Sequence, residues 1–427
     1  MNAHERIEYN NLSMHLCIIW IWLAVIYSGV IQDKYFQVPG GMLIFGVGIL
    51  LTFIASFNKV DLDLQMIFPK EILLLSVYML YMLPDGVLFS PSIALHMNQW
   101  VTSVEYLFVL IVIATIIRCS GTNSFHLLLF IEAIILAVIF LSNPIYFDGG
   151  RYSISTKVNP NGLGMYFSMG IWGALYFNNK RKIPIAGSLG LSAIFLYGIF
   201  LTGSRKALIS ALIIIGLWFV FILLPEIRTT NWLWGFVVII FVVLIGWYLG
   251  RRLLPAYENS IIADRMRNLG NELSEGHRAD LYRYGWLLFK KHPIFGVGFQ
   301  GFKYYYNLYY STMYYSHATL VEVPVSGGVI GSCIYILSYV ASIYRCVYIF
   351  FYYKKDAHHN DELKACKMLL ILWVVMLFYT TCIIHPYQLE SFIYFGVLFG
   401  ESLVLYDKTK DTKQVEAVLH NRSKYIK

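Results

Sequence analysis

The sequence predicts an all-α integral membrane protein with about twelve transmembrane helices. Of its 427 residues, 58% are hydrophobic and only 14% are charged, whereas a soluble domain carries about 25% charged residues. Apolar runs of about 17–20 residues recur along the chain, and this is the length that a helix needs to cross a bilayer. No polar linker divides the first 400 residues, which excludes several soluble domains in series. The period-2 alternation of a membrane β-barrel is absent.

Twelve apolar segments are predicted to span the membrane. They cover residues 14–31, 40–57, 67–83, 101–118, 125–142, 161–177, 183–201, 207–224, 231–249, 328–351, 367–385 and 390–406. One polar stretch, residues 250–316, is predicted to form a large loop between the ninth and tenth spans. The tail after Asp407 is polar, and we expect it to be mobile.

The distribution of basic residues predicts the orientation. With the N-terminus in the cytoplasm, the inner segments hold 18 Lys and Arg residues and the short outer loops hold five. Cytoplasmic loops of membrane proteins are enriched in Lys and Arg, so both termini are predicted to be cytoplasmic. The net charge of +8 is therefore a topology signal and does not indicate a nucleic-acid partner. Arg345 falls near an inner helix end, where we expect it to extend towards the headgroups.

Two of the five outer cations stand in a short turn, Gly203-Ser204-Arg205-Lys206. A guanidinium beside a glycine and a hydroxyl, at the start of a helix, offers a fork of donors that suits a phosphate. The competing interpretation is an ordinary arginine at the membrane interface. The large loop is also basic, with a net charge of +4, and a phosphate-bearing lipid would account for cations on the outer face.

The end of the loop predicts an amphipathic helix that starts near His277-Arg278 and runs to Lys291. Leu281, Leu288 and Phe289 share one apolar face of it. Arg278 would lie at the helix N-terminus, where the helix dipole also favours anions, and Arg283 would lie one turn further. An ordinary surface helix is the alternative.

Two glycine motifs follow. Gly296, Gly298 and Gly301 match the spacing of a dinucleotide-binding loop, but no βαβ unit surrounds them, so we expect a tight turn. Further on, Pro324 and Gly327-Gly328 predict a bent entry into the tenth span.

His317 precedes this bent entry and could accept a proton near neutral pH. Glu322 is five residues on, and an ideal helix would not place it on the same face. The alternative for His317 is a capping residue at headgroup level.

Seven tyrosines crowd just before His317. They are Tyr304, Tyr305, Tyr306, Tyr309, Tyr310, Tyr314 and Tyr315. Such rings can stack on sugars, but they also form the aromatic belts of membrane proteins, and the sequence favours a belt. No His/Cys cluster has zinc-like spacing, so we expect no metal site.

The order of four elements resembles the bacterial O-antigen ligase and O-antigen polymerase family of membrane glycosyltransferases. These elements are Asn159-Pro160-Asn161-Gly162-Leu163-Gly164, then Thr202-Gly203-Ser204-Arg205, then Arg278 with His292-Pro293-Ile294-Phe295-Gly296-Val297-Gly298, and finally Ser316-His317 with Gly327-Gly328. The resemblance covers mainly residues 159–340. An asparagine often follows the family's histidine, where this chain has Ala318.

The resemblance implies a fold of the membrane-embedded (GT-C-like) glycosyltransferase type with one large extracytoplasmic loop. Residues 1–158 would form the first five helices, 159–350 the catalytic core with the loop 250–316, 351–406 the last two helices, and 407–427 a cytoplasmic tail. The protein would be a multi-pass protein of the bacterial plasma membrane, with its active site on the extracytoplasmic face.

The same resemblance implies a metal-independent, inverting transfer from an undecaprenyl-diphosphate-linked oligosaccharide, without a cofactor. Arg205 and Arg278 would hold the diphosphate with help from Lys206 and Arg283, and His317 would be the catalytic base or contact a substrate. Further candidates are Glu322, Asn161 and Tyr315.

Three functions remain open from the sequence. The favoured one is polymerisation of lipid-linked repeat units of a surface polysaccharide such as O-antigen, capsule or exopolysaccharide. The second is transfer of a finished glycan to lipid A-core or another surface acceptor, and the third is a transporter or flippase of lipid-linked sugars. The absence of two related halves speaks against transport. Besides the substrate and the bilayer, a flippase and a chain-length regulator are the expected partners.

Overall fold

The computed structural model describes residues 69–120, 123–147, 150–155, 158–230, 277–355 and 359–425, together with residues 19, 20, 46, 50 and 54. The predicted spans at 14–31 and 40–57 lie outside these residues apart from the five single positions. The predicted span at 231–249 and the part of the loop before residue 277 also lie outside them.

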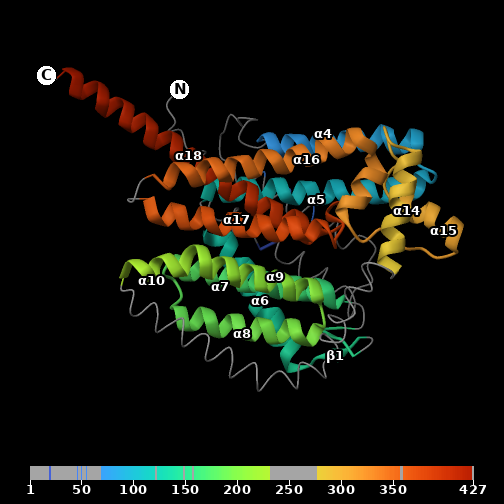
Figure 1. Cartoon of the computed structure of the whole chain (residues 1–427), viewed down its shortest axis with the longest axis horizontal. Helices are drawn as coiled ribbons and strands as arrows, with labels where there is room; N and C mark the ends of the chain where they lie inside the picture. Colours follow the sequence, from blue (N-terminus) through green and yellow to red (C-terminus); the bar gives the residue numbers. More distant parts are fainter. Residues whose placement is uncertain are drawn as a thin grey trace. The chain divides into compact units, whose positions relative to one another are not determined.

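The described residues are almost entirely helical (Figure 1). Their order is α4 (Lys70–Phe89), α5 (Ile93–Ser120), α6 (Asn123–Ser142), β1 (Ile145–Tyr146), β2 (Tyr152–Ser153), α7 (Pro160–Asn179), α8 (Ile185–Thr202), α9 (Arg205–Trp218), the π-helix η2 (Phe219–Leu223), α10 (Leu224–Thr230), α14 (His277–Lys291), α15 (Gly301–Tyr310), α16 (Thr319–Tyr353), α17 (Asn360–Thr380), the 3₁₀ turn η4 (His385–Tyr387) and α18 (Leu389–Tyr425).

Within the described residues, seven helices are long and apolar enough to cross a membrane. They are α4, α5, α8, the continuous stretch from α9 to Ile227, α16, α17 and α18. Every predicted span in the described part of the chain coincides with a helix, and α6 and α7 account for the other two. The total of twelve spans stays a prediction.

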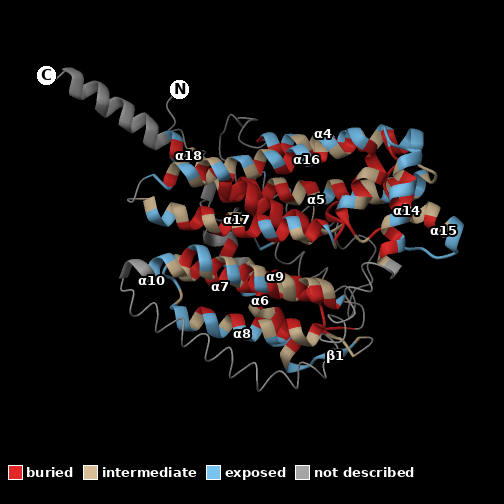
Figure 2. Cartoon of the chain, in the orientation of Figure 1, coloured by how far each residue is buried: buried red, intermediate tan, exposed pale blue. Residues whose placement is uncertain are grey.

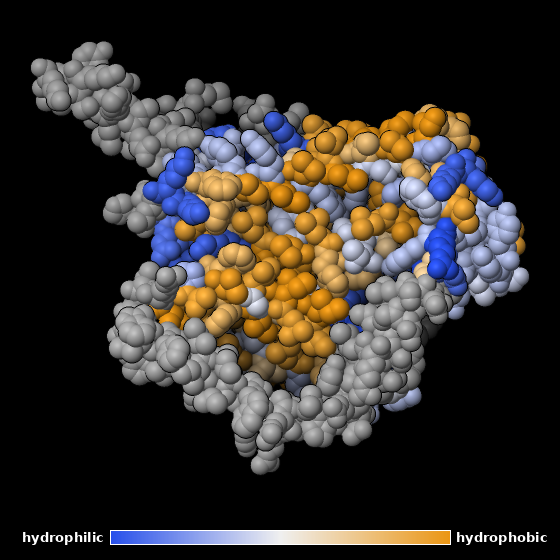
Figure 3. Space-filling model, viewed as in Figure 1, coloured by the Kyte–Doolittle hydropathy of each residue, from blue (hydrophilic) through white to orange (hydrophobic). Residues whose placement is uncertain are grey.

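The chain divides into two compact units, and each is described by itself. In the first unit, α16 packs against α4 and α17, and α5 packs against α4 and α18 (Figure 1). Helices α17 and α18 form its centre (Figure 2). Within the most apolar 18-residue stretch of each helix, 67% and 83% of the residues are buried. Helices α4 and α16 instead expose aliphatic side chains such as Leu80 and Val340. Figure 3 shows hydrophobic residues on the surface where these helices run. That surface suits contact with lipid.

Two pairs of ionisable side chains lie among the helices of this unit. Arg345 of α16 makes a two-pronged contact with Glu71 of α4, in which Nη2 donates to Oε2 at 2.7 Å. Arg345 is therefore bound by a carboxylate on the neighbouring helix, and its extension towards the headgroups stays a prediction. His126 and Glu401 form the second pair, with Nε2 and Oε2 2.7 Å apart.

Helix α16 is broken near its start. It begins at Thr319, nine residues before the predicted span at 328–351, and Gly328 interrupts it with φ 60° and ψ −160°. Only glycine adopts this conformation readily. The bent entry expected from Gly327-Gly328 is confirmed. The hydroxyl of Tyr81 in α4 donates to the carbonyl of Gly327 at 3.0 Å and fastens the break to the neighbouring helix.

The second unit holds most of α6, the β1–β2 hairpin and α7 to α10. Helix α7 packs against α8 and α9. Helix α8 ends at Gly203, which has the left-handed φ of 60° that closes many helices, and α9 starts two residues later. The turn between these two helices is thus as short as the sequence predicts.

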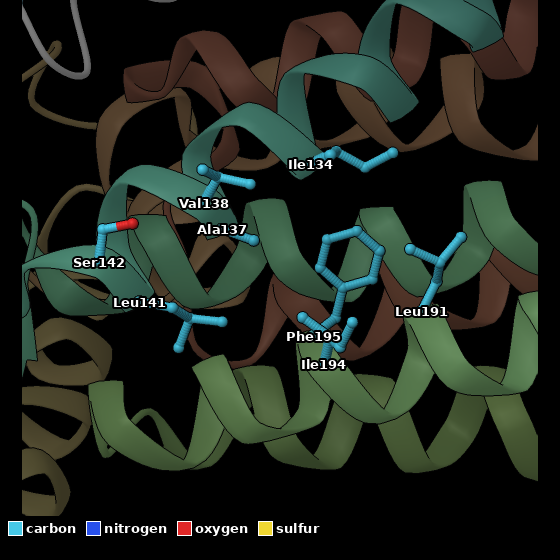
Figure 4. Close-up of a pocket in the computed structure, with 8 residues that line it drawn as sticks. All are labelled: Ile134, Ala137, Val138, Leu141, Ser142, Leu191, Ile194 and Phe195. Carbon is cyan, nitrogen blue, oxygen red and sulfur yellow. The ribbon is translucent and has the colours of Figure 1, made fainter.

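An open groove of about 410 Å³ runs between α6 and α8 of this unit (Figure 4). It is lined by Ile134, Ala137, Val138, Leu141, Ser142, Leu191, Ile194 and Phe195. This lining offers hydrocarbon and a single hydroxyl, so the groove does not suit sugar chemistry.

The tail after Asp407 is not a separate element, because α18 continues to Tyr425. Arg118 of α5 holds the region where the predicted tail begins. Its Nη2 lies 2.9 Å from Oδ2 of Asp407.

Replacing Gly328 should destabilise the fold. A β-carbon there would collide with the carbonyl oxygen of Ile294, and the φ of Gly328 is unfavourable for any other residue. We expect Gly328→Ala to lower the free energy of unfolding by about 2 kcal/mol or more. Gly190→Ala is the control, because a β-carbon at Gly190 meets nothing within 4 Å. Thermal unfolding of both purified variants in detergent measures the difference, and equal stability would contradict the structure.

Candidate functional site

His317 lies in a strained turn directly before α16. Its φ is 61°, a left-handed value that is uncommon for a non-glycine residue. The imidazole is half-buried, and its centroid is 4.2 Å from that of the Tyr315 ring. Such strain persists only where neighbours fix the backbone, and it often marks functional sites.

The turn is fixed by Glu322, which is 1% exposed. Its Oε2 accepts hydrogen bonds from the hydroxyl and the backbone N–H of Ser316, at 2.6 and 3.4 Å. The carboxylate therefore holds the residue before the histidine, which the sequence spacing did not suggest.

Tyr387 extends this network to the start of α15. Its hydroxyl donates to Oε1 of Glu322 at 2.8 Å and accepts the N–H of Gln300 at 3.1 Å. Gln300 also has a left-handed φ, of 60°. Burial, and then the charge of Glu322, raises the pKa of Tyr387 well above that of a free phenol, so the hydroxyl stays protonated and can donate. One carboxylate thus anchors both strained turns, at the two ends of the α15 segment.

The loop His292–Gly298, which we call the glycine loop, is bound to the start of α16 through its backbone. The N–H groups of Val297 and Gly298 donate to the carbonyls of Val325 and Ser326, both at 2.9 Å. In return, the N–H of Val329 donates to the carbonyl of Pro293 at 2.8 Å. The loop therefore satisfies backbone groups next to the break in α16.

This close approach requires glycine. A β-carbon on Gly296 would lie 2.5 Å from the carbonyl oxygen of Ser326. Gly296 and Gly298 have φ values of 81° and 72°, which confirms the expected tight turn.

In the second unit, Arg205 is the first residue of α9 and is 8% exposed. Ser204 precedes it as the N-cap and is fully buried. Its hydroxyl neither caps the helix nor meets a hydrogen-bond partner among the described residues. A helix N-terminus with a guanidinium and an available hydroxyl is suited to an anion. Lys206 follows in the first turn and is half-buried.

The start of α7 packs directly on this turn. A β-carbon on Gly164 would lie 2.8 Å from that of Ala207, so the glycine permits the contact. Asn159 caps α7 by accepting the N–H of Asn161 at 2.9 Å, and Pro160 occupies the first helical position. Asn161 thus lies at the N-terminus of α7.

Arg151 is a further cation of this site, and the sequence reasoning missed its role. Its Nε donates to the carbonyl of Thr202 at 3.2 Å, and its side chain crosses Gly203. The β1–β2 hairpin places it there, where its guanidinium carbon is 6.0 Å from the centre of the Phe147 ring. The available signal was its position as one of five basic residues in the short outer loops.

Helix α14 carries the last two predicted arginines. Arg278 stands in its first turn and is half-buried. Arg283 is exposed, and its Nη1 lies 3.6 Å from Oδ1 of Asp280. The predicted apolar face is confirmed, since Leu281 and Leu288 are buried and Phe289 packs beside them.

The structure thus brings the four sequence elements together in two pairs. The Asn159–Gly164 segment meets the Thr202–Arg205 turn in the second unit, and the His292–Gly298 loop meets the Ser316–Gly328 segment in the first. Arg205 and Arg278 belong to the second unit and His317 to the first. A common site for these three residues stays a prediction.

Part of the chain is similar to a known protein family. A family model described as O-antigen ligase matches residues 190–336, which run from within α8 to the middle of α16. This range includes the turn at Arg205, the helix with Arg278, the glycine loop and His317. No curated protein matches the chain.

Removing the carboxylate of Glu322 should destabilise the turn at His317. Glu322→Ala leaves three donors without their acceptor, so we expect the free energy of unfolding to fall by about 2–4 kcal/mol. Tyr387→Phe removes one of these donors. The double variant should therefore lose less unfolding free energy than the sum of the losses of the two single variants, by a coupling energy of about 1–2 kcal/mol.

Unfolding of the single and double variants in mixed micelles measures this coupling. Asp361→Ala is the control, because Asp361 is an exposed carboxylate at the start of α17. Strict additivity of the two losses would show that the hydrogen bond between Glu322 and Tyr387 contributes nothing.

Proposed function

We propose that this integral membrane protein is a glycosyltransferase that polymerises lipid-linked oligosaccharide repeat units of a surface polysaccharide, and the similarity of residues 190–336 to the O-antigen ligase family model supports this proposal. Its donor would be a glycan on undecaprenyl diphosphate, used on the outer face of the bacterial plasma membrane. The acceptor would be a sugar hydroxyl of a second lipid-linked unit.

The observation that carries this proposal is the cationic turn at the start of α9. Buried Arg205, the hydroxyl of Ser204 and the side chain of Arg151 gather around one helix N-terminus. Glycosyl transfer breaks the bond between the anomeric carbon and the diphosphate, and negative charge develops on the departing phosphate. Fixed donors aimed at this charge stabilise the transition state, typically by about 3–4 kcal/mol for one donor.

The reaction also requires a proton acceptor. The acceptor hydroxyl oxygen attacks the anomeric carbon from the side opposite the diphosphate, so the configuration inverts. The bonding electrons leave with the lipid diphosphate, and the hydroxyl proton passes to the imidazole of His317. Arg278 would add positive charge at the diphosphate, with Lys206 and Arg283 as weaker contributors. These steps need neither a metal nor a cofactor.

Substitution of the three main residues tests the proposal. We expect Arg205→Ala, Arg278→Ala and His317→Ala each to reduce polymer formation by roughly a hundredfold or more, because each removes a transition-state contact or the base. Polymer length and amount are read from a gel of cell-surface glycan, after membrane levels of each variant are matched. Lys182→Ala, an exposed cation in the turn between α7 and α8, is the control. Long polymers from all three variants would refute the proposal.

Arg151 gives a separate test of the cationic turn. Its fork of donors cannot be replaced by a single ammonium, so Arg151→Lys should recover only part of the activity that Arg151→Ala loses. We expect the alanine variant to form polymer roughly tenfold to a hundredfold more slowly. A rate equal to that of the unmodified protein would remove Arg151 from the site.

The second candidate is a ligase that transfers a finished glycan to lipid A-core or another surface acceptor, and the description of the matching family favours it. The phenotype of a gene deletion separates the two. Single repeat units on the final acceptor indicate a polymerase, and long chains retained on the lipid carrier indicate a ligase. A flippase would instead leave lipid-linked sugar on the cytoplasmic leaflet.

A further inference from the structure

Several tyrosine rings contact one another around α15. We call Tyr284, Tyr306, Tyr309, Tyr310, Tyr314 and Tyr315 the tyrosine array. The Tyr284 ring meets those of Tyr306, Tyr309 and Tyr310 edge-on, with centroids 5.3, 5.9 and 5.9 Å apart. Tyr306 stacks on Tyr310 at 4.5 Å and meets Tyr314 edge-on at 6.3 Å.

One end of the array touches the candidate base. The Tyr315 ring lies against the imidazole of His317, and Tyr314 precedes it in the chain. The Tyr314 ring contacts that of Tyr306, which stacks on Tyr310 of α15. The ring at the histidine is therefore joined to the rings on α15 by the peptide bond between Tyr314 and Tyr315.

The array combines fixed and exposed rings. Tyr306 is buried in a small core with Leu281, Phe302 and Val325. Tyr310 stacks on Tyr306 and Tyr309 meets Tyr284 edge-on, yet Tyr309 and Tyr310 are 66% and 55% exposed. Rings held in this way lose little conformational entropy when a ligand covers them.

The chemistry of the segment distinguishes a sugar from a lipid surface. Residues 304–317 contain seven tyrosines, Asn307, three serine or threonine residues and no charged residue. Tyrosine with small polar residues is the composition of adaptable binding surfaces. Helices that lie on membranes carry several Lys and Arg residues on their polar face and often Trp on the other, whereas residues 304–317 have none of the three and α15 has Lys303 as its one charged residue.

We propose that the tyrosine array binds the saccharide chain of a substrate and guides it to or from His317. Apolar faces of successive sugar rings would stack on Tyr309, Tyr310, Tyr314 and Tyr315, while Asn307 and the neighbouring hydroxyl groups bond to the sugar hydroxyls. The lack of charge suits a neutral oligosaccharide. This inference rests on the proposed function and adds a binding site to it.

Binding of free glycan tests the array without requiring catalysis. The probes are fragments of the host's own surface polysaccharide, released by mild acid, freed of lipid and separated into single repeats and chains of several repeats. Saturation-transfer NMR with the purified full-length protein measures their affinity. We expect the longer fragments to bind more tightly than the single repeat. The double variant Y309A/Y310A should bind them roughly tenfold more weakly, since two stacking contacts are lost.

Two matched variants serve as controls. Y309F/Y310F keeps both rings and should keep most of the affinity. Y344A removes a tyrosine of α16 that is 71% exposed and lies outside the array, and it should change nothing. In cells, Y309A/Y310A should also shift the polysaccharide to shorter chains.

Two outcomes would overturn the inference. One is unchanged fragment binding by Y309A/Y310A. The other is loss of the alanine variant from the membrane while binding per folded molecule stays normal, which would assign the rings to the lipid interface. The proposed function is judged separately, because Arg205→Ala should abolish polymerisation while the fragments still bind.

Discussion

Backbone contact between the glycine loop and the broken start of α16 is the constraint on which the first unit depends. A helix break leaves carbonyl and N–H groups without their normal partners, and buried groups of this kind are costly. Here the loop supplies those partners at 2.8–2.9 Å, and only residues without a β-carbon allow it to come so close. The turn with His317, the buried carboxylate of Glu322 and the start of α15 are all positioned from this junction.

The second unit uses the same device for a different purpose. Gly164 lets α7 approach the turn before α9, and Gly203 closes α8 so that Arg205 can start the next helix at once. In the second unit, glycines allow cations and helix N-termini to come close together. In the first unit, glycines allow the backbone contact that positions the strained turn with His317. The cationic turn and the histidine turn thus each depend on glycines of their own unit.

Composition and apolar run length predicted the helices well, because the hydrophobic thickness of a bilayer sets the length of a span whatever the sequence in detail. The motifs predicted the candidate site residues, and the glycine spacing predicted the tight turn at Gly296. The partners of those residues escaped prediction. Glu322 contacts Ser316 through a turn that helical periodicity does not describe, and Tyr387 comes from a segment 65 residues further on. The partners of Arg151 and Arg345, Thr202 and Glu71, escaped prediction for the same reason, since they are distant in the sequence.

The pairing of Arg345 with Glu71 bears on how the protein is made. An arginine in a membrane helix costs about 2.5–3.5 kcal/mol on insertion, and a glutamate is also unfavourable there. Because α4 precedes α16 in the chain, its carboxylate is synthesised before the arginine. Pairing the two side chains offsets part of the cost of keeping each charge among apolar helices, on the helix that follows the turn with His317.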